Sequence, residues 1–150
     1  MHVTDVEAIP LESSVDTVRM KTGETEQTIG VSPVVVKVHT DAGITGLGET
    51  LTYDPTGGDA VYAAEGVNAL ARHLVGETPR DVSQRWSELY QHAKRSGAFK
   101  PLSAIDEALW DIAAKDAGKP LYELLGGAAG DVAAYATFPH RKPTEELVED

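Results

Sequence analysis

The stretch that decides the fold runs from Ser103 to Gly127 and reads SAIDEALWDIAAKDAGKPLYELLGG. Within it Ile105, Leu109 and Ile112 recur at i, i+4 and i+7, so they fall on one side of a helix. This spacing predicts an amphipathic helix whose apolar stripe packs against another layer of the protein.

Both ends of this helix carry recognisable signals. Ser103 followed three residues later by Asp106 is typical of a capping box, which predicts that the helix begins there. Gly118 and Pro120 predict its end. A second short helix then follows and stops at the paired glycines Gly126 and Gly127.

Strand patterns lie upstream. The β-branched run Val34–Thr40, the turn residues of Asp41–Gly43 and the returning segment Ile44–Thr50 predict a β-hairpin. The segment Val3–Leu11 alternates between apolar and polar residues, and Pro10 within it favours an edge strand. Three antiparallel strands are therefore expected.

The connection Glu12–Pro33 shows no hydrophobic periodicity and is rich in Ser, Thr, Gly and charged residues. We expect an irregular loop here. Connections of this length in a compact domain are usually functional lids or disordered segments.

Two more amphipathic helices are predicted between the hairpin and Ser103. The first ends near Gly76, and the second begins near Asp81. Their apolar stripes comprise Ala64, Val67, Leu70, Ala71 and Leu74 in the first helix and Val82, Trp86, Leu89, Tyr90 and Ala93 in the second. Strands followed by helices without alternation predict an α+β fold, a three-stranded antiparallel meander with a helical layer on one face.

Composition narrows the classes of function. The 150 residues include 13 Lys and Arg against 24 Asp and Glu, a net charge of −11, which disfavours nucleic acids and anionic membrane surfaces as partners. Such acidity also fits a surface adapted to high salt. There is no cysteine, and no apolar run reaches the length of a membrane helix. We therefore expect a cytoplasmic protein.

Two segments together suggest a family. The run VKVHTDAGITGLGE at 36–49 and the block 105–127 resemble the N-terminal capping domain of the mandelate racemase and muconate-lactonising branch of the enolase superfamily. The resemblance implies a capping domain over residues 1–127. It also implies that residues 128–150, with a strand at Val132–Thr137 and a helix starting near Pro143, form the first strand and the start of the helix of a truncated (β/α)8 barrel.

The resemblance also implies a chemistry. Enzymes of this branch remove a proton α to a carboxylate, with Mg²⁺ stabilising the enediolate. Their bases and metal ligands lie on later barrel strands, so no catalytic or metal-binding residue is assigned here. Dehydration of a sugar acid is the expected reaction, with racemisation or cycloisomerisation as alternatives. A capping subunit acting in trans and a separate binding module are two further possibilities.

Substrate-binding candidates follow from the loops that this domain folds over a barrel mouth. They are Arg19, Met20 and Lys21 in the first loop, for an anionic substrate, and Tyr53 just after the third strand. Solvated loop charge and local packing are the alternatives. His140, in the loop after the expected barrel strand, is a weaker candidate. A small carboxylate substrate, the barrel itself and a homo-oligomeric partner are the expected partners.

Other polar residues are assigned structural roles. Asp106, Asp111 and Asp116 turn by about 140° per step around a helix and cannot converge on a metal ion, whereas Asp111 suits an ion pair with Lys115. The five histidines lack zinc-site spacing. Gly46 and Gly48, within the hairpin, suit close strand packing better than phosphate binding, and Trp110 is expected to be an anchor for packing, within the helical layer or against the barrel.

Overall fold

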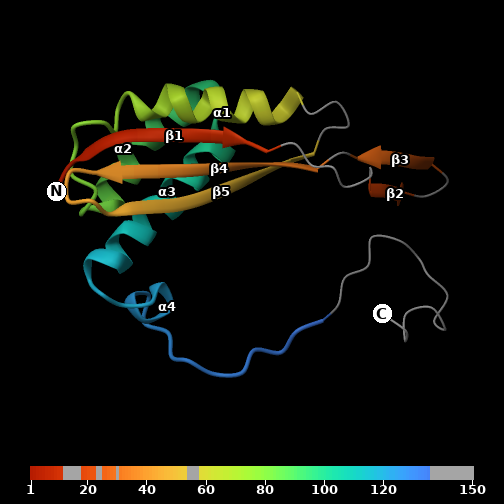
Figure 1. Cartoon of the computed structure of the whole chain (residues 1–150). Helices are drawn as coiled ribbons and strands as arrows, with labels where there is room; N and C mark the ends of the chain where they lie inside the picture. The colour runs from red at the N-terminus through yellow and green to blue at the C-terminus, as the bar shows by residue number, and fades with distance from the viewer. Residues whose placement is uncertain (12–17, 23–24, 30, 54–57, 136–150) are drawn as a thin grey trace.

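The sheet forms one layer of the protein and the helices form the other (Figure 1). The computed structural model describes residues 1–11, 18–22, 25–29, 31–53 and 58–135. Three antiparallel strands, β1 (Val3–Pro10), β4 (Val31–Thr40) and β5 (Thr45–Tyr53), lie in the order β1-β4-β5. This confirms the predicted meander, and β1, which contains Pro10, is an edge strand as expected.

A β-bulge gives β1 its buried side. Val3 pairs with Thr40 and Asp5 pairs with His39, so the register shifts between Val3 and Asp5. The extra residue brings Val3 and Val6 to the same face, although strict alternation would separate them. Both side chains are buried in the main core.

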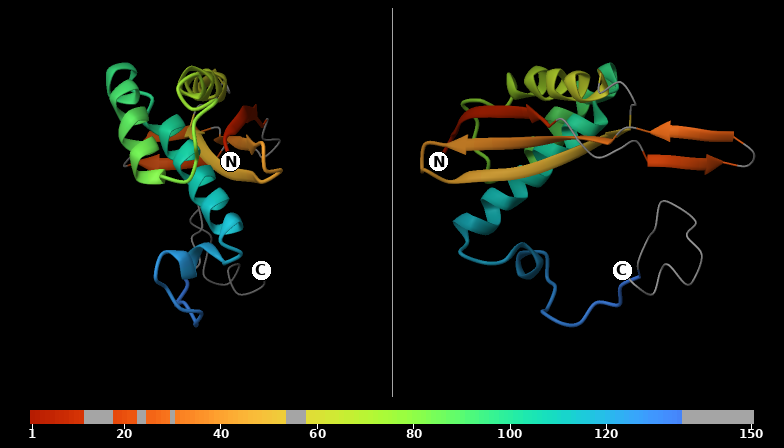
Figure 2. Two further views of the ribbon diagram at one scale, coloured as in Figure 1. Left: turned by 90° about the vertical axis from the view of Figure 1, so that its left-hand side faces the viewer. Right: turned by 45° about the vertical axis from the view of Figure 1, so that its right-hand side comes forward.

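The connection between β1 and β4 differs from the prediction. Strands β2 (Val18–Thr22) and β3 (Thr25–Ile29) form a separate two-stranded antiparallel sheet where an irregular loop was expected. The views in Figure 2 show this hairpin extending beyond one end of the main sheet. Its strands carry few apolar residues, so hydrophobic periodicity did not reveal them.

The helices are α1 (Gly58–Ala71), α2 (Val82–Ser96), α3 (Phe99–Asp116) and the single turn α4 (Leu121–Leu124). Helix α1 ends at Ala71, before the predicted end near Gly76, but its predicted stripe is buried throughout, including Leu74 in the turn that follows. Asp81 caps α2 by accepting a hydrogen bond from the Gln84 N–H at 2.9 Å. In α2 the stripe is partly wrong, because Trp86 is 40% exposed and stacks on Tyr90.

Arg85, next to Trp86 in the sequence, is buried instead. Its guanidinium contacts the carboxylates of Glu77 at 2.8 Å and Glu88 at 3.0 Å, and the residue is only 5% exposed. A buried cation requires such partners, because an unpaired charge inside a protein costs several kcal/mol, on the order of 3–5 when one partner is removed. The sequence pattern assigned no role to this arginine.

The start of α3 corrects the capping-box prediction. The helix begins at Phe99 after Ala98, so Ser103 and Asp106 lie inside it and neither caps it. Pro101 is the third residue of this helix. It looks like a helix breaker, yet proline is tolerated in a first turn, where its missing N–H has no intrahelical partner to lose.

The end of α3 matches the prediction. Gly118 has a φ of +64°, and the Lys119 and Gly118 N–H groups donate to the carbonyls of Ala114 and Lys115. This is a Schellman motif, in which glycine adopts the left-handed conformation at no steric cost. The paired glycines after α4 are also confirmed as its end, with the Gly127 N–H donating to the Tyr122 carbonyl.

Helix α3 lies directly against β5 because two glycines leave room for its backbone. A Cβ on Gly46 would lie 2.0 Å from the Ala108 carbonyl oxygen, and one on Gly48 would lie 2.0 Å from that of Ala104. The two glycines thus permit close packing, but of a helix on the strand rather than of strand on strand as predicted. Trp110 packs against the same core, within the helical layer.

Three polar side chains of α3 cover the outer edge of β5. Asp111 accepts from the Leu47 N–H at 2.8 Å, Glu107 accepts from the Glu49 N–H at 3.0 Å, and Lys115 donates to the Thr45 carbonyl at 2.7 Å. Lys115 also pairs with Asp111 at 2.7 Å, as predicted. The helix thus satisfies backbone groups that a fourth strand would otherwise bind. We call this set of three the edge row.

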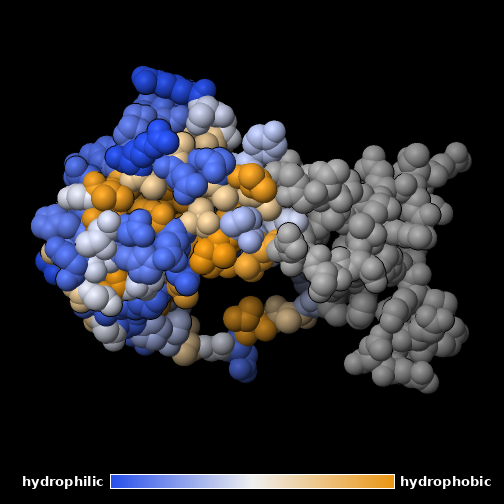
Figure 3. Space-filling model, turned by 45° about the horizontal axis from the view of Figure 1, so that its top comes forward, coloured by the Kyte–Doolittle hydropathy of each residue, from blue (hydrophilic) through white to orange (hydrophobic). Residues whose placement is uncertain are grey.

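The segment after α4 lies apart from this body (Figure 3). A strand was predicted at Val132–Thr137, but residues 131–135 have no regular structure, and Val132 and Tyr135 are 87% and 89% exposed. No described segment runs parallel to them, and an isolated strand has no partner for its backbone groups. Residues 136–150, with His140 and the helix expected near Pro143, lie outside the described residues.

Candidate functional site

The predicted substrate-binding positions lie toward one end of the main sheet. Tyr53, the last residue of β5, pairs with Val31, the first residue of β4. Strand β3 ends only two residues before Val31, so the hairpin leaves the sheet beside the end of β5 (Figure 2). Positions far apart in the sequence are therefore brought to one region by backbone pairing.

Arg19, Met20 and Lys21 occupy the middle of β2. Their backbone partners in β3 are Thr28, Gln27 and Glu26. The structure thus places all three on a hairpin strand, where a loop was expected. Their side chains and that of Tyr53 lie outside the described residues, so their role in binding stays a prediction.

The base of this region is firmly held. The Thr52 hydroxyl, adjacent to Tyr53, donates to the Ser32 carbonyl at 2.7 Å, and Thr52 is only 2% exposed. Two residues along β4, Val34 is fully buried against α1, in a cluster with Ala60, Ala63 and Ala64. The hairpin and the end of β5 therefore project from a packed base.

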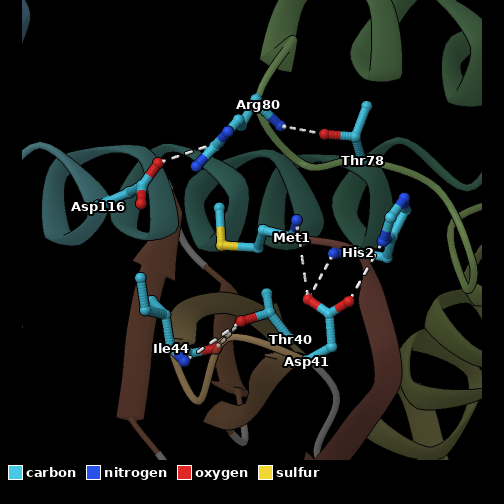
Figure 4. Close-up of polar contacts among 8 residues, drawn as sticks. All are labelled: Met1, His2, Thr40, Asp41, Ile44, Thr78, Arg80 and Asp116. Atoms are coloured by element: carbon cyan, nitrogen blue, oxygen red, sulfur yellow. Dashed lines mark hydrogen bonds and ion pairs between the residues drawn. The ribbon is translucent and has the colours of Figure 1, made fainter.

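The opposite end of the sheet contains a different set of polar contacts (Figure 4). Asp41 accepts from the His2 N–H at 2.7 Å, and Arg80 pairs with Asp116 at 3.2 Å. The hydrogen bond from the His2 backbone holds the pKa of Asp41 below its usual value. The first contact fastens the N-terminus to the β4–β5 turn, and the second joins the α1–α2 connection to the end of α3, so both roles are structural.

The acidic residues of α3 do not converge. Asp111 faces Leu47 and Lys115, Asp116 pairs with Arg80, and Asp106 is half-buried with its pKa raised, first by burial and then by neighbouring Glu107. Across the part of the chain that the structure describes, no three potential ligands cluster as a metal ion requires. The residues described do not fit a magnesium site, and we derive no metal-dependent step from them.

None of the described helices is both long and apolar enough to cross a membrane.

Fold and site together define a class. A three-stranded meander backed by three helices, with a hairpin inserted after the first strand, is the architecture of an enolase-type N-terminal capping domain. The chain belongs to the mandelate racemase / muconate lactonizing enzyme family, whose N-terminal domain matches residues 3–126.

The chain is similar in sequence to curated dehydratases. Over 99 residues the chain is 41% identical to D-galactonate dehydratase of Xanthomonas euvesicatoria and 38% identical to that of Ralstonia nicotianae. In both cases the match covers 64% of this chain and 25% of the relative. The chain thus matches about a quarter of the length of these enzymes.

Solved structures agree on the fold. A member of the enolase superfamily from Polaromonas sp. JS666 has a TM-score of 0.76 at 32% identity, covering 99% of this chain and 40% of that one. The L-talarate/galactarate dehydratase of Salmonella typhimurium, solved with Mg and L-lyxarohydroxamate, has a TM-score of 0.65 at 26% identity, covering 81% and 32%. Family members are therefore enzymes that include dehydratases.

Proposed function

We propose that this chain is the substrate-selecting lid of a magnesium-dependent acid-sugar dehydratase. The observation that carries the proposal is the placement of Arg19, Lys21 and Tyr53 toward one end of the sheet, in a chain that is 41% identical to a D-galactonate dehydratase over 99 residues. Racemase or cycloisomerase activity remains the alternative within the family. We also retain cytoplasmic localisation as a prediction.

The two parts of the chain have different roles in this proposal. Residues 1–127 form the lid in this proposal, and residues 128–150 begin a barrel that supplies the base and the metal ligands. Magnesium would stabilise the enediolate formed when the proton α to the carboxylate is removed. The cationic residues of β2 would attract the substrate carboxylate, and Tyr53 would cover the substrate and exclude water.

A chimeric enzyme tests the proposal. Residues 1–127 replace the corresponding segment of the Xanthomonas D-galactonate dehydratase, and dehydration of D-galactonate is measured with Mg²⁺. We expect activity in the chimera. The double variant Arg19→Ala/Lys21→Ala should lower kcat/KM by about tenfold or more, because a hydrogen bond to a charged group is worth about 1.5–3 kcal/mol.

Arg80→Ala is the matched control, because Arg80 is also a surface cation but pairs with Asp116 at the other end of the sheet. It should leave kcat/KM unchanged. Equal losses of kcat/KM in both variants would show that the β2–β3 hairpin does not contribute to substrate binding. A chimera that racemises sugar acids without dehydrating them would favour the alternative reaction.

The 150-residue chain alone should not turn over D-galactonate with Mg²⁺, since its described residues supply no metal-ligand cluster. Magnesium-dependent product formation by the pure chain, followed by the appearance of the keto acid, would contradict the lid assignment. Restoration of activity on mixing with a separate barrel chain would instead identify a capping subunit that acts in trans.

A further inference from the structure

The β4–β5 strand pair has a threonine hydroxyl bond at each of its two ends. At the turn end, the Thr40 hydroxyl donates to the Ile44 carbonyl at 2.8 Å (Figure 4). At the lid end, where the pair finishes at Tyr53, the Thr52 hydroxyl donates to the Ser32 carbonyl at 2.7 Å. Each hydroxyl thus fastens one strand to the backbone opposite.

Packing alone does not require a threonine at either end. Thr40 is 7% exposed and Thr52 is 2% exposed, so both side chains lie on the buried face of the sheet. Val34, Val36 and Val38 of β4 are fully buried on the same face, and valine has nearly the shape of threonine without its hydroxyl. A buried hydroxyl lowers stability unless it forms a hydrogen bond. The two hydroxyls are therefore explained by the bonds that they form.

The two ends differ in what else keeps the strands together. At the turn end, residues 41–44 join β4 directly to β5, so the chain itself holds the strands side by side. At the lid end, β4 is preceded by the hairpin, and β5 continues toward α1, which begins at Gly58. Only the pair of Val31 with Tyr53 lies beyond Thr52 in the ladder, and the ends of a ladder open most easily. The Thr52 bond therefore lies where the turn gives the strand pair no support.

This bond also joins the two segments that the proposed lid uses. Thr52 directly precedes Tyr53, and Ser32 lies three residues after Ile29, where the β2–β3 hairpin ends. A shift between the two backbones would move Tyr53 relative to the hairpin cations. A displacement of about 1 Å in a group that orients a substrate costs up to about a hundredfold in rate. Two segments that contact one substrate therefore need a fixed separation.

We propose that Thr52 is a positioning residue of the lid. Its hydroxyl holds the end of β5 and the base of the β2–β3 hairpin at a fixed separation, so that both segments contact one substrate together. The inference rests on the proposed lid function, because it takes the substrate contacts to come from these two segments.

Amide hydrogen exchange in the 150-residue chain measures the bond without any reaction. The Leu11 N–H donates to the Pro33 carbonyl, so Pro33 faces β1 and its neighbour Ser32 faces β5. Thr52→Val should therefore speed exchange of the amides at positions 32 and 52 by about tenfold, because one hydrogen bond is lost, while Val38 stays protected. Thr52→Ser keeps the hydroxyl and should restore slow exchange. Unchanged exchange in Thr52→Val would overturn the proposal, whatever the activity of the chimera.

Thr40→Val is the matched control, because it removes a bond of similar length from a buried threonine at the turn end of the same strand pair. In the chimeric enzyme, Thr52→Val should lower kcat/KM for D-galactonate by about tenfold, and Thr40→Val should leave it unchanged. Thr52→Ser should recover most of the loss. Both valine variants should lower the midpoint of urea unfolding by similar amounts. Equal losses of kcat/KM in the two would therefore reflect lost stability alone and would refute positioning.

A double-mutant cycle tests whether Thr52 acts through its neighbour. The losses from Thr52→Val and Tyr53→Ala should be less than additive, because a displaced strand end has little left to disturb once the tyrosine ring is gone. Fully additive losses would contradict the proposal.

Failure of the lid function gives a different pattern of results. An inactive unsubstituted chimera, or equal kcat/KM in the hairpin double variant and Arg80→Ala, would refute the lid function and with it the role of Thr52 in substrate binding. A chimera that is active and sensitive to the hairpin double variant, but in which Thr52→Val behaves like Thr40→Val, would refute the role of Thr52 alone.

Discussion

The body formed by residues 3–116 and the segment 121–135 contain similar residue types, but those residues have different surroundings. Leu109 of α3 is fully buried and Leu125, after α4, is 61% exposed. Val36 of β4 is fully buried and Val132 is 87% exposed. An apolar residue becomes core only where a second layer covers it, and the tail has none within the described residues.

The largest expected difference concerns the two leucines. Leu109→Ala should lower the free energy of unfolding by about 2–5 kcal/mol, because it leaves a cavity between α3 and the sheet. Leu125→Ala should change it by less than about 0.5 kcal/mol. Urea denaturation followed by circular dichroism measures both values. Similar losses in the two variants would mean that the tail packs on the body in solution.

Two glycines extend the comparison between the body and the segment 121–135 to backbone packing. Gly48→Ala should cost about 1–3 kcal/mol, because the new methyl group meets the Ala104 carbonyl, which the helix holds in place. Gly130→Ala should be nearly neutral, since no atom lies within 4 Å of its added Cβ. Thermal unfolding of the two variants tests this, and a stable Gly48→Ala protein would show that α3 can move away from β5.

The smallest effects come from two aspartates of the body in contrasting surroundings. Burial raises the pKa of Asp106, so its carboxylate opposes folding at neutral pH, and this penalty disappears as pH falls below the ordinary value of 3.8. The pKa of Asp41 is lowered, so its carboxylate stabilises the fold above that value, and the contribution is lost in acid.

At pH 7 Asp106→Asn should therefore raise the midpoint of urea unfolding slightly, and Asp41→Asn should lower it. Both differences should shrink in acid. A pH series of urea titrations provides the measurement, and shifts of the same sign at pH 7 would contradict the assignment of either environment.

The meander, the three helices and most of the core could be predicted from sequence, because strand alternation and helical stripes directly reflect burial on one face. The β2–β3 hairpin could not, since its strands carry few apolar residues and its register comes from backbone pairing. The capping box was wrong because a serine and an aspartate three residues apart also occur inside a helix, and α3 begins at Phe99, before both. Residues 132–135 have no regular structure because no described segment runs beside them to pair with.

For the candidate site, the sequence predicted individual residues but not their arrangement in space. Arg19 and Tyr53 were selected from a family resemblance, and their placement toward one end of the sheet depends on pairing between Val31 and Tyr53.

The edge row fixes the position of β5 as well as covering its backbone. The three contacts repeat along α3 at steps of four residues and along β5 at steps of two. Their spacing therefore fixes the register of the helix on the strand. Sliding β5 by one residue would break all three contacts at once. The position of Tyr53 at the end of β5 therefore depends on the position of α3. A shift of α3 along the strand would move Tyr53 as well.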